Sequence, residues 1–439
     1  DYLTREQKLD KITDLISLAG ITQTDGWQTI VPDRHGDWLN QRDDWFDEFV
    51  VLGDKKGNQL TLFANYSLGI VTNRDAWCYN ASRHTVANSM QDMITCYNEE
   101  VSRFNTAHQT ETTQARKTLG ADFIDNDPTR ISWTRALKAD LAKGHTYVYQ
   151  PQCLIRSLYR PFSKQWLYYN RHFNEMVLQM PRIFPVTGEA NLVIMTTAKG
   201  IKNGFSCTIS NTIPDLNSME AGAQCFPRYL YDEDGSNRHD ALTDAGLAHF
   251  QAAYPNETLS KDDLFYYIYG LLHSPDYRTR YAHNLSKALP RIPPVRRFTD
   301  FQAFTQAGRE LAELHLHYDT VAPYPATLDS SATANHHYRV EKMRYGKRKI
   351  DGKSHKDRTT IVYNPRITVR DIPEAAYDYV VNGKSAIDWV VERQCVKTDK
   401  KSGITNDATR WATGAEGYPR YPLELLLRVI AIRLSSIDV

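Results

Sequence analysis

Apolar residues recur at helical spacing in several separate parts of the chain. Such a stripe predicts a helix that buries one face, and the flanking residues indicate where it begins and ends. Ser82 and Ser260 stand where helix N-caps are expected, and Ser274-Pro275 combines a cap with proline at the first helical position. The predicted helices are 5–19, Ser82 to about Phe104, 129–141, three helices within 260–318, 373–381, 385–396, and Pro422 to Leu434.

Short runs of β-branched and aromatic residues predict strands in the central part of the chain. These runs are 59–71, broken at Ser67 and Gly69, then 145–149, 165–169, 192–197 and 205–210. Together with the helices, they predict a mixed α/β (α+β) fold. We expect a central mixed sheet region at about 145–230, a helical layer at 260–318, and a C-terminal subdomain of strands and helices.

The length of the chain predicts more than one substructure, because 439 residues exceed the size at which a single core usually stops growing. The linker-like segment 320–335 marks one boundary, so we divide the main part into 51–320 and 321–439. The chain starts at Asp1 without methionine, which favours a piece of a longer protein.

Bulk composition is that of an ordinary globular protein, with 41% hydrophobic and 24% charged residues. The net charge is only +1, so any affinity for DNA has to come from local clusters of cations. No apolar run approaches the ~20 residues that a membrane span needs. The six cysteines form no CxxC pair, which argues against a zinc site and predicts reduced thiols and a cytoplasmic location.

Residues 156–185 interleave five cations with seven aromatic side chains, and the only acid among them is Glu175. Such mixing is typical of nucleic-acid contact, but a half-buried strand with solvated arginines has the same composition. We take Arg160, Lys164 and Arg171 as candidate DNA-binding residues. Pro161 restricts the backbone after Arg160 and would help to aim its guanidinium. The alternative for Arg160 is an internal ion pair.

The turn between the strands at 192–197 and 205–210 adds Lys202 and Asn203 to these candidates. Its sequence, AKGIKNG, contains two glycines, so its backbone could approach a phosphate. The spacing is not that of a Walker motif, and nucleotide binding is therefore not predicted.

Residues 342–358 hold eight basic and two acidic residues, a local charge of +6. Flanking strand patterns predict a basic hairpin, and a solvated, disordered loop is the alternative. A hairpin of this charge would contact DNA phosphates. The candidate residues in it are Arg344, Lys347, Arg348 and Lys349.

Catalytic and metal-binding residues are not predicted anywhere in the chain. Pro214-Asp215 with Glu220 resembles a nuclease core, but the residues that follow Glu220 are Ala221 and Gly222, without the required lysine. His315 and His317 lie two apart, which directs them to different faces of a helix.

Several segments, taken together, resemble the C-terminal region of Type ISP restriction–modification enzymes, in the expected order along almost the whole chain. They are TNRDAWCYN (72–80), SLYRPFSKQWLYYN (157–170), FYYIYGLLHSPDYR (265–278), ALPRIP (288–293), NGKSAIDWVVERQ (382–394) and SGITNDATRW (402–411). That family joins a nuclease, a helicase-like motor, an adenine methyltransferase and a target-recognition domain in one chain. The resemblance implies that residues 1–50 are the join from the methyltransferase domain, and that 51–439 form the target-recognition domain.

The resemblance also implies which cofactors to expect and where. The sequence lacks the motifs that bind these cofactors: an NPPY methyltransferase motif, a glycine-rich S-adenosylmethionine loop, a Walker A motif and a DEAD-like box. Asn364-Pro365 begins like NPPY but continues to Arg366. We therefore expect no cofactor in this chain, and S-adenosylmethionine, ATP and Mg²⁺ in the upstream domains. Double-stranded DNA and those upstream domains are the expected partners. A scaffold that binds RNA or protein, and a self-contained DNA-modifying enzyme, are the alternatives.

Overall fold

The computed structural model describes residues 3–15, 29–185, 190–411 and 418–435. The chain divides into two compact units, Asp1–Asp44 and Trp45–Val439. The predicted division of the main part near residue 320 stays a prediction.

The first unit contains helix α1 (Arg5–Leu15) and a loop held by one carboxylate. Both oxygens of Asp33 are used: Oδ1 accepts the backbone N–H groups of His35 and Asp37, and Oδ2 accepts that of Arg42. The predicted helix 5–19 is confirmed as far as Leu15, and its remaining residues lie outside the described part of the chain.

Two four-stranded sheets form the centre of the second unit and confirm the mixed α/β fold. All strand pairs are antiparallel except β4–β8, which is parallel. The first sheet has the order β2 (Ser67–Leu68), β9 (Gln224–Pro227), β6 (Val193–Thr196), β7 (Cys207–Ser210). The second has the order β3 (Tyr79–Asn80), β5 (Ser163–Tyr168), β4 (Leu154–Arg160), β8 (Ile213–Pro214). The strands predicted at 165–169, 192–197 and 205–210 are confirmed.

The strand predicted at 145–149 is wrong. The backbone N–H and C=O of Tyr147 both bond to the side-chain amide of Asn98, at 2.9 and 2.7 Å, and this replaces pairing with another strand. The amide satisfies the same two groups that a neighbouring strand would, so the apolar pattern alone could not exclude a strand here.

The segment 213–216 connects the two sheets. Asp215 N–H donates to the Leu158 carbonyl of β4 at 3.0 Å, and Ile70 N–H donates to the Pro214 carbonyl at 2.9 Å. The neighbouring Gly69 lies so close that an added Cβ atom would stand 2.6 Å from the Asp215 carbonyl. Only glycine permits this approach of the two backbones.

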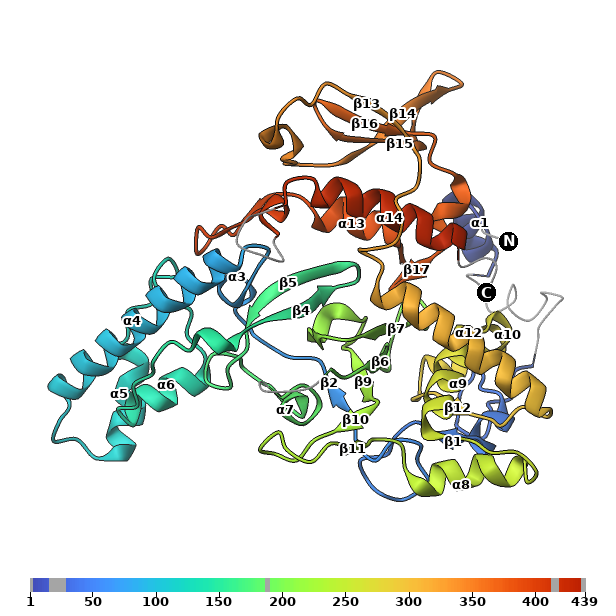
Figure 1. Cartoon of the computed structure of the whole chain (residues 1–439), viewed down its shortest axis with the longest axis horizontal. Helices are drawn as coiled ribbons and strands as arrows, with labels where there is room; N and C mark the ends of the chain where they lie inside the picture. Colours follow the sequence, from blue (N-terminus) through green and yellow to red (C-terminus); the bar gives the residue numbers. More distant parts are fainter. Residues whose placement is uncertain (1–2, 16–28, 186–189, 412–417, 436–439) are drawn as a thin grey trace. The chain divides into compact units, whose positions relative to one another are not determined.

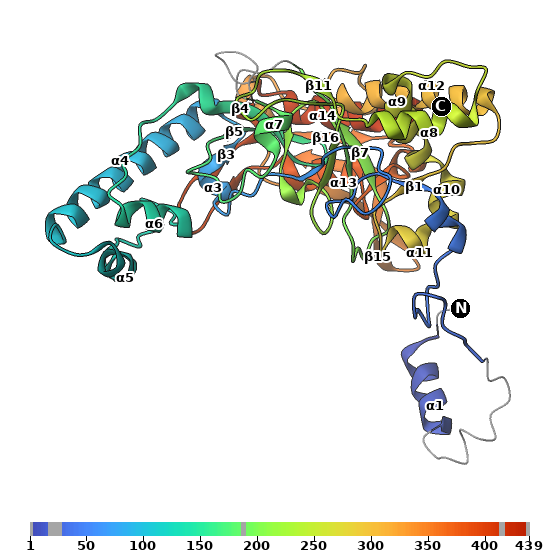
Figure 2. The same cartoon turned by 90° about the horizontal axis from the view of Figure 1, so that it is seen from below.

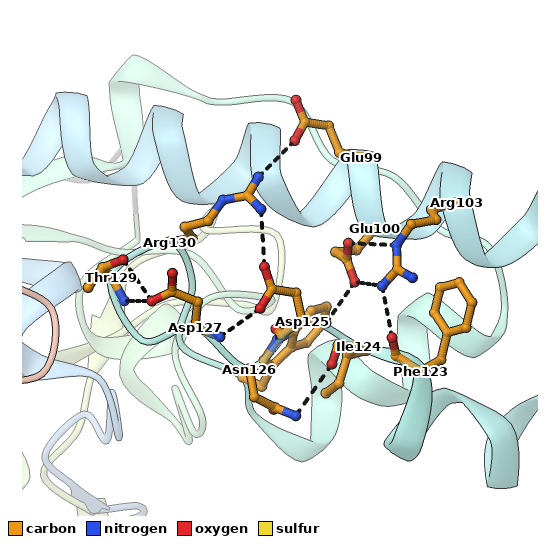
Figure 3. Close-up of polar contacts among 11 residues, drawn as sticks. Glu99, Glu100, Arg103, Phe123, Ile124, Asp125, Asn126, Asp127, Thr129 and Arg130 are labelled. Atoms are coloured by element: carbon orange, nitrogen blue, oxygen red, sulfur yellow. Dashed lines mark hydrogen bonds and ion pairs between the residues drawn. The ribbon is translucent and has the colours of Figure 1, made fainter.

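Helices α4 (Arg83–Ala107), α5 (Thr113–Phe123) and α6 (Arg135–Ala142) pack together beside the sheets (Figures 1 and 2). Ser82 caps α4 as predicted, accepting the Thr85 N–H. Glu100 on α4 accepts hydrogen bonds from Arg103 and from the Asp125 backbone, and Figure 3 shows how this network ties 123–130 to α4. Helix α6 begins at Arg135, later than the predicted residue 129.

A second helical group contains α8 (Asp244–Ala253), α9 (Lys261–His273), α10 (Pro275–Arg280), α11 (Ala282–Leu285) and α12 (Phe298–Leu316). The capping box at Ser260 and Asp263 is present, so the predicted helical layer is confirmed. Gly270 of α9 and Gly308 of α12 meet at the helix crossing, where a Cβ on either would overlap a backbone carbonyl oxygen of the other helix.

The C-terminal part adds a third four-stranded sheet, β13-β16-β15-β14, and the helices α13 and α14 (Figure 1). The bounds are β13 (Thr327–Ser330), β14 (Arg344–Ile350), β15 (Lys353–Asn364), β16 (Ile367–Arg370), α13 (Ala386–Arg393) and α14 (Tyr421–Ser435). The helix predicted at 373–381 is wrong. The chain there forms a short 3-10 turn, η5 (Glu374–Tyr377), and then β17 (Val380–Val381), which pairs with β18 (Lys384–Ser385).

Short elements complete the described structure. They are η1 (Asp44–Glu48), β1 (Val50–Val51), α3 (Asp75–Cys78), η2 (Pro151–Cys153), α7 (Met180–Ile183), η3 (Leu216–Ser218), β10 (Tyr229–Leu230), β11 (His239–Asp240), β12 (Arg291–Ile292), η4 (Asn335–Tyr338), β19 (Lys397–Thr398), β20 (Thr405–Asn406) and η6 (Ala408–Arg410). In the described part of the chain, no helix is long and apolar enough to cross a membrane.

We expect Gly308→Ala to destabilise the protein by about 1–3 kcal/mol, because the new methyl group has to push α9 away from α12. Gly120→Ala in α5 is the matched control, since its Cβ would meet only ordinary contacts at 3.5 Å or more. The control should be neutral or stabilising by up to about 1 kcal/mol, which is the usual gain for replacing glycine within a helix. Thermal and urea unfolding measure both; equal effects of the two substitutions would contradict the close crossing.

Candidate nucleic-acid interface

Arg160, the first sequence candidate, lies at the end of β4 and forms an internal ion pair. Its side chain is 11% exposed, and its guanidinium donates to Asp215 at 2.6 Å and lies 3.4 Å from Asp75. Burial raises the pKa of Asp215 to about 6, although the neighbouring Arg160 opposes that rise. The guanidinium also stacks on the Tyr159 ring at 3.9 Å. The structure thus gives Arg160 the internal ion pair that the sequence left as an alternative.

Lys164 and Arg171 differ in their surroundings. Lys164 on β5 is half-buried and binds both carboxylate oxygens of Asp319 at 3.0 Å. Arg171 lies in the exposed turn after β5 and forms no ion pair with any described residue. Of the three cations predicted in 156–185, Arg171 is therefore the one whose charge is available to a partner.

Lys202 and Asn203 lie in the exposed turn between β6 and β7, as predicted. Glu220 accepts the backbone N–H groups of both, and also the side-chain amide of Asn203 at 3.1 Å. The same turn touches the C-terminal part, because Gly383 lies against the Asn203 side chain. Glu220 therefore fixes the turn and leaves the Lys202 ammonium exposed.

The basic segment 342–358 forms the predicted hairpin. Strands β14 and β15 pair from Arg344↔Val362 to Ile350↔Lys353, and the turn is Asp351-Gly352, both with positive φ. The base of the hairpin belongs to the third sheet, where Ile361 and Tyr363 are buried. A bulge after Tyr345 separates this base from a tip, residues 346–357, which has no buried side chain. The tip is drawn at the top of Figure 1.

Basic residues of the tip face each other across the two strands. Lys347 stands directly opposite Lys356, and Arg348 opposite His355. Like charges directly opposite in a hairpin destabilise it, so the free tip carries an electrostatic cost. Among the described residues, no carboxylate forms an ion pair with Arg344, Lys347, Arg348, Lys349 or Lys353, although Asp357 of the tip attracts Arg348 at longer range. A bound anion would relieve this repulsion.

The base of the hairpin is held in place by α13. Tyr345 donates to Asp388 at 2.7 Å, and the Lys356 ammonium lies 3.6 Å from the centre of the Tyr345 ring. Although burial opposes the charged form, hydrogen bonds from Ser385 and Tyr345 lower the pKa of Asp388, which stays an anion 3.7 Å from Lys356. The tip therefore extends from a fixed base.

Sequence reasoning missed the basic residues of the second strand as individual site residues. Lys353, His355 and Lys356 lie opposite the predicted residues, and only the register of the hairpin shows that both strands form one charged surface. The two-residue turn Asp351-Gly352 was the available signal, because it fixes that register. Among the described residues, no group of three or more His, Cys, Asp or Glu side chains is arranged to hold a metal ion.

We expect Arg160→Ala to lower the stability of the protein by about 3–5 kcal/mol, because Asp215 would be left buried without its partner. Arg171→Ala, an exposed arginine from the same stretch, should change stability by no more than about 0.5 kcal/mol. In the double variant Arg160→Ala/Asp215→Ala the loss should be smaller than the sum of the single losses, as for residues in direct contact. Additive losses in urea unfolding would show that the pair contributes no coupling.

Comparison with known proteins gives a consistent result. The Type ISP C-terminal specificity domain family matches residues 61–425. Similar solved structures are a nuclease-deletion mutant of the Type ISP restriction-modification enzyme LlaGI in complex with a DNA substrate mimic (36% identity, TM-score 0.82) and the ATP-dependent Type ISP enzyme LlaBIII bound to DNA (36%, 0.81). A DrdV–DNA complex is 28% identical with a TM-score of 0.79.

These alignments cover nearly all of this chain, 100%, 99% and 100% respectively, but only 38%, 26% and 42% of those chains. No curated protein matches. The chain belongs to the family of Type ISP C-terminal specificity domains.

Proposed function

We propose that this chain recognises a specific sequence in double-stranded DNA on behalf of a Type ISP restriction–modification enzyme. The observation that carries the proposal is the exposed basic hairpin, in which Lys347, Lys349 and Lys353 form no ion pair with any described residue. Family membership supports it, as do the structural relatives, which are described as complexes with DNA.

The shape of the hairpin suits duplex DNA. The major groove of B-DNA admits a two-stranded β-ribbon, and base edges there carry a distinct pattern of donors and acceptors. Phosphate contacts set the position of a protein on DNA, whereas contacts to base edges select the sequence. We assign Lys347, Lys349 and Lys353 to phosphates. Arg348, whose planar fork can contact guanine with two hydrogen bonds, is the candidate for base reading within the tip.

Asn203 and Arg171 extend the proposed contact surface beyond the hairpin. The Asn203 side chain can offer amide groups to an adenine edge, and Glu220 already orients the turn that carries it. Arg160 and Lys164 act in our proposal as internal supports, since their charges are paired with Asp215 and Asp319.

Adenine methylation, motor activity and cleavage belong, in this proposal, to domains outside residues 1–439. The sequence lacks their motifs, so S-adenosylmethionine, ATP and Mg²⁺ would act there. The relatives are longer than this chain, and one of them is described as ATP-dependent. Six free cysteines support the expected reducing, cytoplasmic location.

Selection from a random duplex pool, followed by affinity measurements on the enriched sequence and on scrambled duplexes, tests the function directly. We expect the chain to prefer the enriched duplex over duplex RNA, because the major groove of A-form RNA is too narrow for a ribbon. Equal affinity for RNA would favour the scaffold alternative, and failure to bind any duplex would refute the proposal.

The triple variant Lys347→Ala/Arg348→Ala/Lys349→Ala tests the hairpin. We expect weaker binding to specific and scrambled duplexes, with the slope of log K against log salt reduced by about one unit for each phosphate that the hairpin no longer neutralises. Binding isotherms over a range of salt concentrations measure both quantities.

The matched control removes the same charge elsewhere: Lys117→Ala/Lys400→Ala/Lys401→Ala, three exposed lysines outside the hairpin. The control should bind DNA like the parent chain. If the hairpin variant behaves like the control, the hairpin is a solvated loop without a role in DNA binding.

A further inference from the structure

An open cleft of about 520 Å³ lies between three segments that are distant in the sequence. Its walls are the loop 51–59, the start of the β6–β7 turn at 198–199, and residues 288–291. Hydrogen bonds fix the walls: Leu52 N–H donates to the Pro290 carbonyl at 3.1 Å, and Gly200 N–H donates to the Ser286 carbonyl at 3.0 Å. The cleft is therefore built by the fold and does not depend on a single loop.

Positive charge dominates the lining of the cleft. Lys55, Lys56, Lys199 and Arg291 line it, against one carboxylate, Asp54. Hydrogen bonds from the backbone N–H groups of Lys56 and Asn58 occupy both oxygens of Asp54 and lower its pKa.

The arginine of the cleft is already paired, and the lysines are not. Arg291 lies 3.7 Å from the Asp47 carboxylate and donates to backbone carbonyls of Asp47 and Phe49. No described carboxylate lies within ion-pair distance of Lys55, Lys56 or Lys199. Three lysines without a direct ion pair therefore line one cleft, where the Asp54 carboxylate attracts Lys56 at longer range.

The aromatic wall of the cleft orients one of these lysines. The Tyr66 ring stacks on Phe226 at 5.2 Å between ring centres, and the Lys55 ammonium lies 4.7 Å from the Tyr66 ring centre. Gly53 allows this arrangement, since a Cβ there would stand 2.6 Å from the ring. Holding the ammonium against a fixed ring lowers the ordering cost of a contact with an anion.

A continuous series of contacts connects the cleft to the basic hairpin. From the hairpin, Tyr345 binds Asp388 of α13, and the turn just before α13 contains Asn382 and Gly383. Gly383 touches Asn203, and Asn382 Oδ1 accepts the N–H of Glu220, the residue that fixes the 198–204 turn. Lys199 stands at the other end of that turn, in the cleft. In Figure 2 the segments labelled β15 and α11 extend to the same side of the second unit.

We propose that this cleft is a second DNA-backbone site, in which Lys55, Lys56 and Lys199 bind phosphates of the same duplex that the hairpin contacts. The proposal rests on the proposed function and adds to it a location: the phosphates lie on the side of the 198–204 turn opposite Asn203. Lysine suits this role as a mobile point charge, which neutralises phosphate without reading bases. The contacts would therefore position the Asn203 turn on the duplex and carry no sequence preference of their own.

The test is the variant Lys55→Ala/Lys56→Ala/Lys199→Ala in the 439-residue chain, with Lys117→Ala/Lys400→Ala/Lys401→Ala as the charge-matched control. At low salt we expect the cleft variant to lose roughly 10- to 100-fold in affinity for the enriched and scrambled duplexes alike. The slope of log K against log salt should become shallower by up to about three units. Each phosphate that no longer contacts a lysine retains about one counterion, which binding of the parent chain would release. The melting temperature should match that of the control, since all three lysines are exposed.

A second arm combines the cleft and hairpin variants. If both sites bind one duplex, the reductions in slope should add, and the combined variant should retain little dependence on salt. An acidic peptide such as polyglutamate serves as a competitor, and binding of that peptide to the cleft without any effect of the cleft variant on DNA would overturn the proposal.

The two proposals fail in different ways. If the parent chain binds DNA, the hairpin variant weakens it and the cleft variant equals the control, then the cleft proposal is wrong and the proposed function stands. If the parent chain binds no duplex at all, both fail.

Discussion

The ion pair between Arg160 and Asp215 holds together the region on which the rest of the second unit depends. Asp215 follows β8, which pairs with β4, and its neighbours bond to the 69–71 segment beside β2. The two central sheets thus meet at a residue whose charge is almost completely buried, with 2% side-chain exposure. A buried ion pair adds little net stability, but loss of one partner is costly, so both residues have to be kept together.

The charges of the hairpin are exposed, in contrast to the buried ion pair of Arg160 and Asp215. Lys347 stands opposite Lys356, and Lys356 alone of these two lies near a carboxylate, Asp388. The opposed like charges make the tip less stable than a neutral hairpin of equal length. Attachment through Tyr345 and Asp388 limits this cost to the tip and leaves the sheet at its base intact. In this domain, cations at strand ends support the fold, and cations on projecting elements remain available to an anionic partner.

The same division applies to the cleft and to the 198–204 turn. Glu220 accepts hydrogen bonds from the backbone of the turn, Asp54 accepts them from its own loop, and Asp47 lies beside Arg291. Each of these acids therefore has a structural role. Lysines without a direct ion pair, namely Lys55, Lys56 and Lys199 in the cleft and Lys347, Lys349 and Lys353 on the hairpin, lie on either side of the turn. This distribution of charge explains how a chain with a net charge of +1 can offer a strongly basic surface.

Local patterns in the sequence determined the parts of the structure that depend on neighbouring residues. The caps at Ser82 and Ser260 and the hairpin at 342–358 arise from contacts within a few residues, and all three predictions are confirmed. The partners of Arg160 and Lys164 could not be predicted in this way. Asp215 lies 55 residues from Arg160, and Asp319 lies 155 residues from Lys164. Whether a cation is exposed or paired inside depends on which distant carboxylate the packing of the sheets brings to it, and composition does not contain that information.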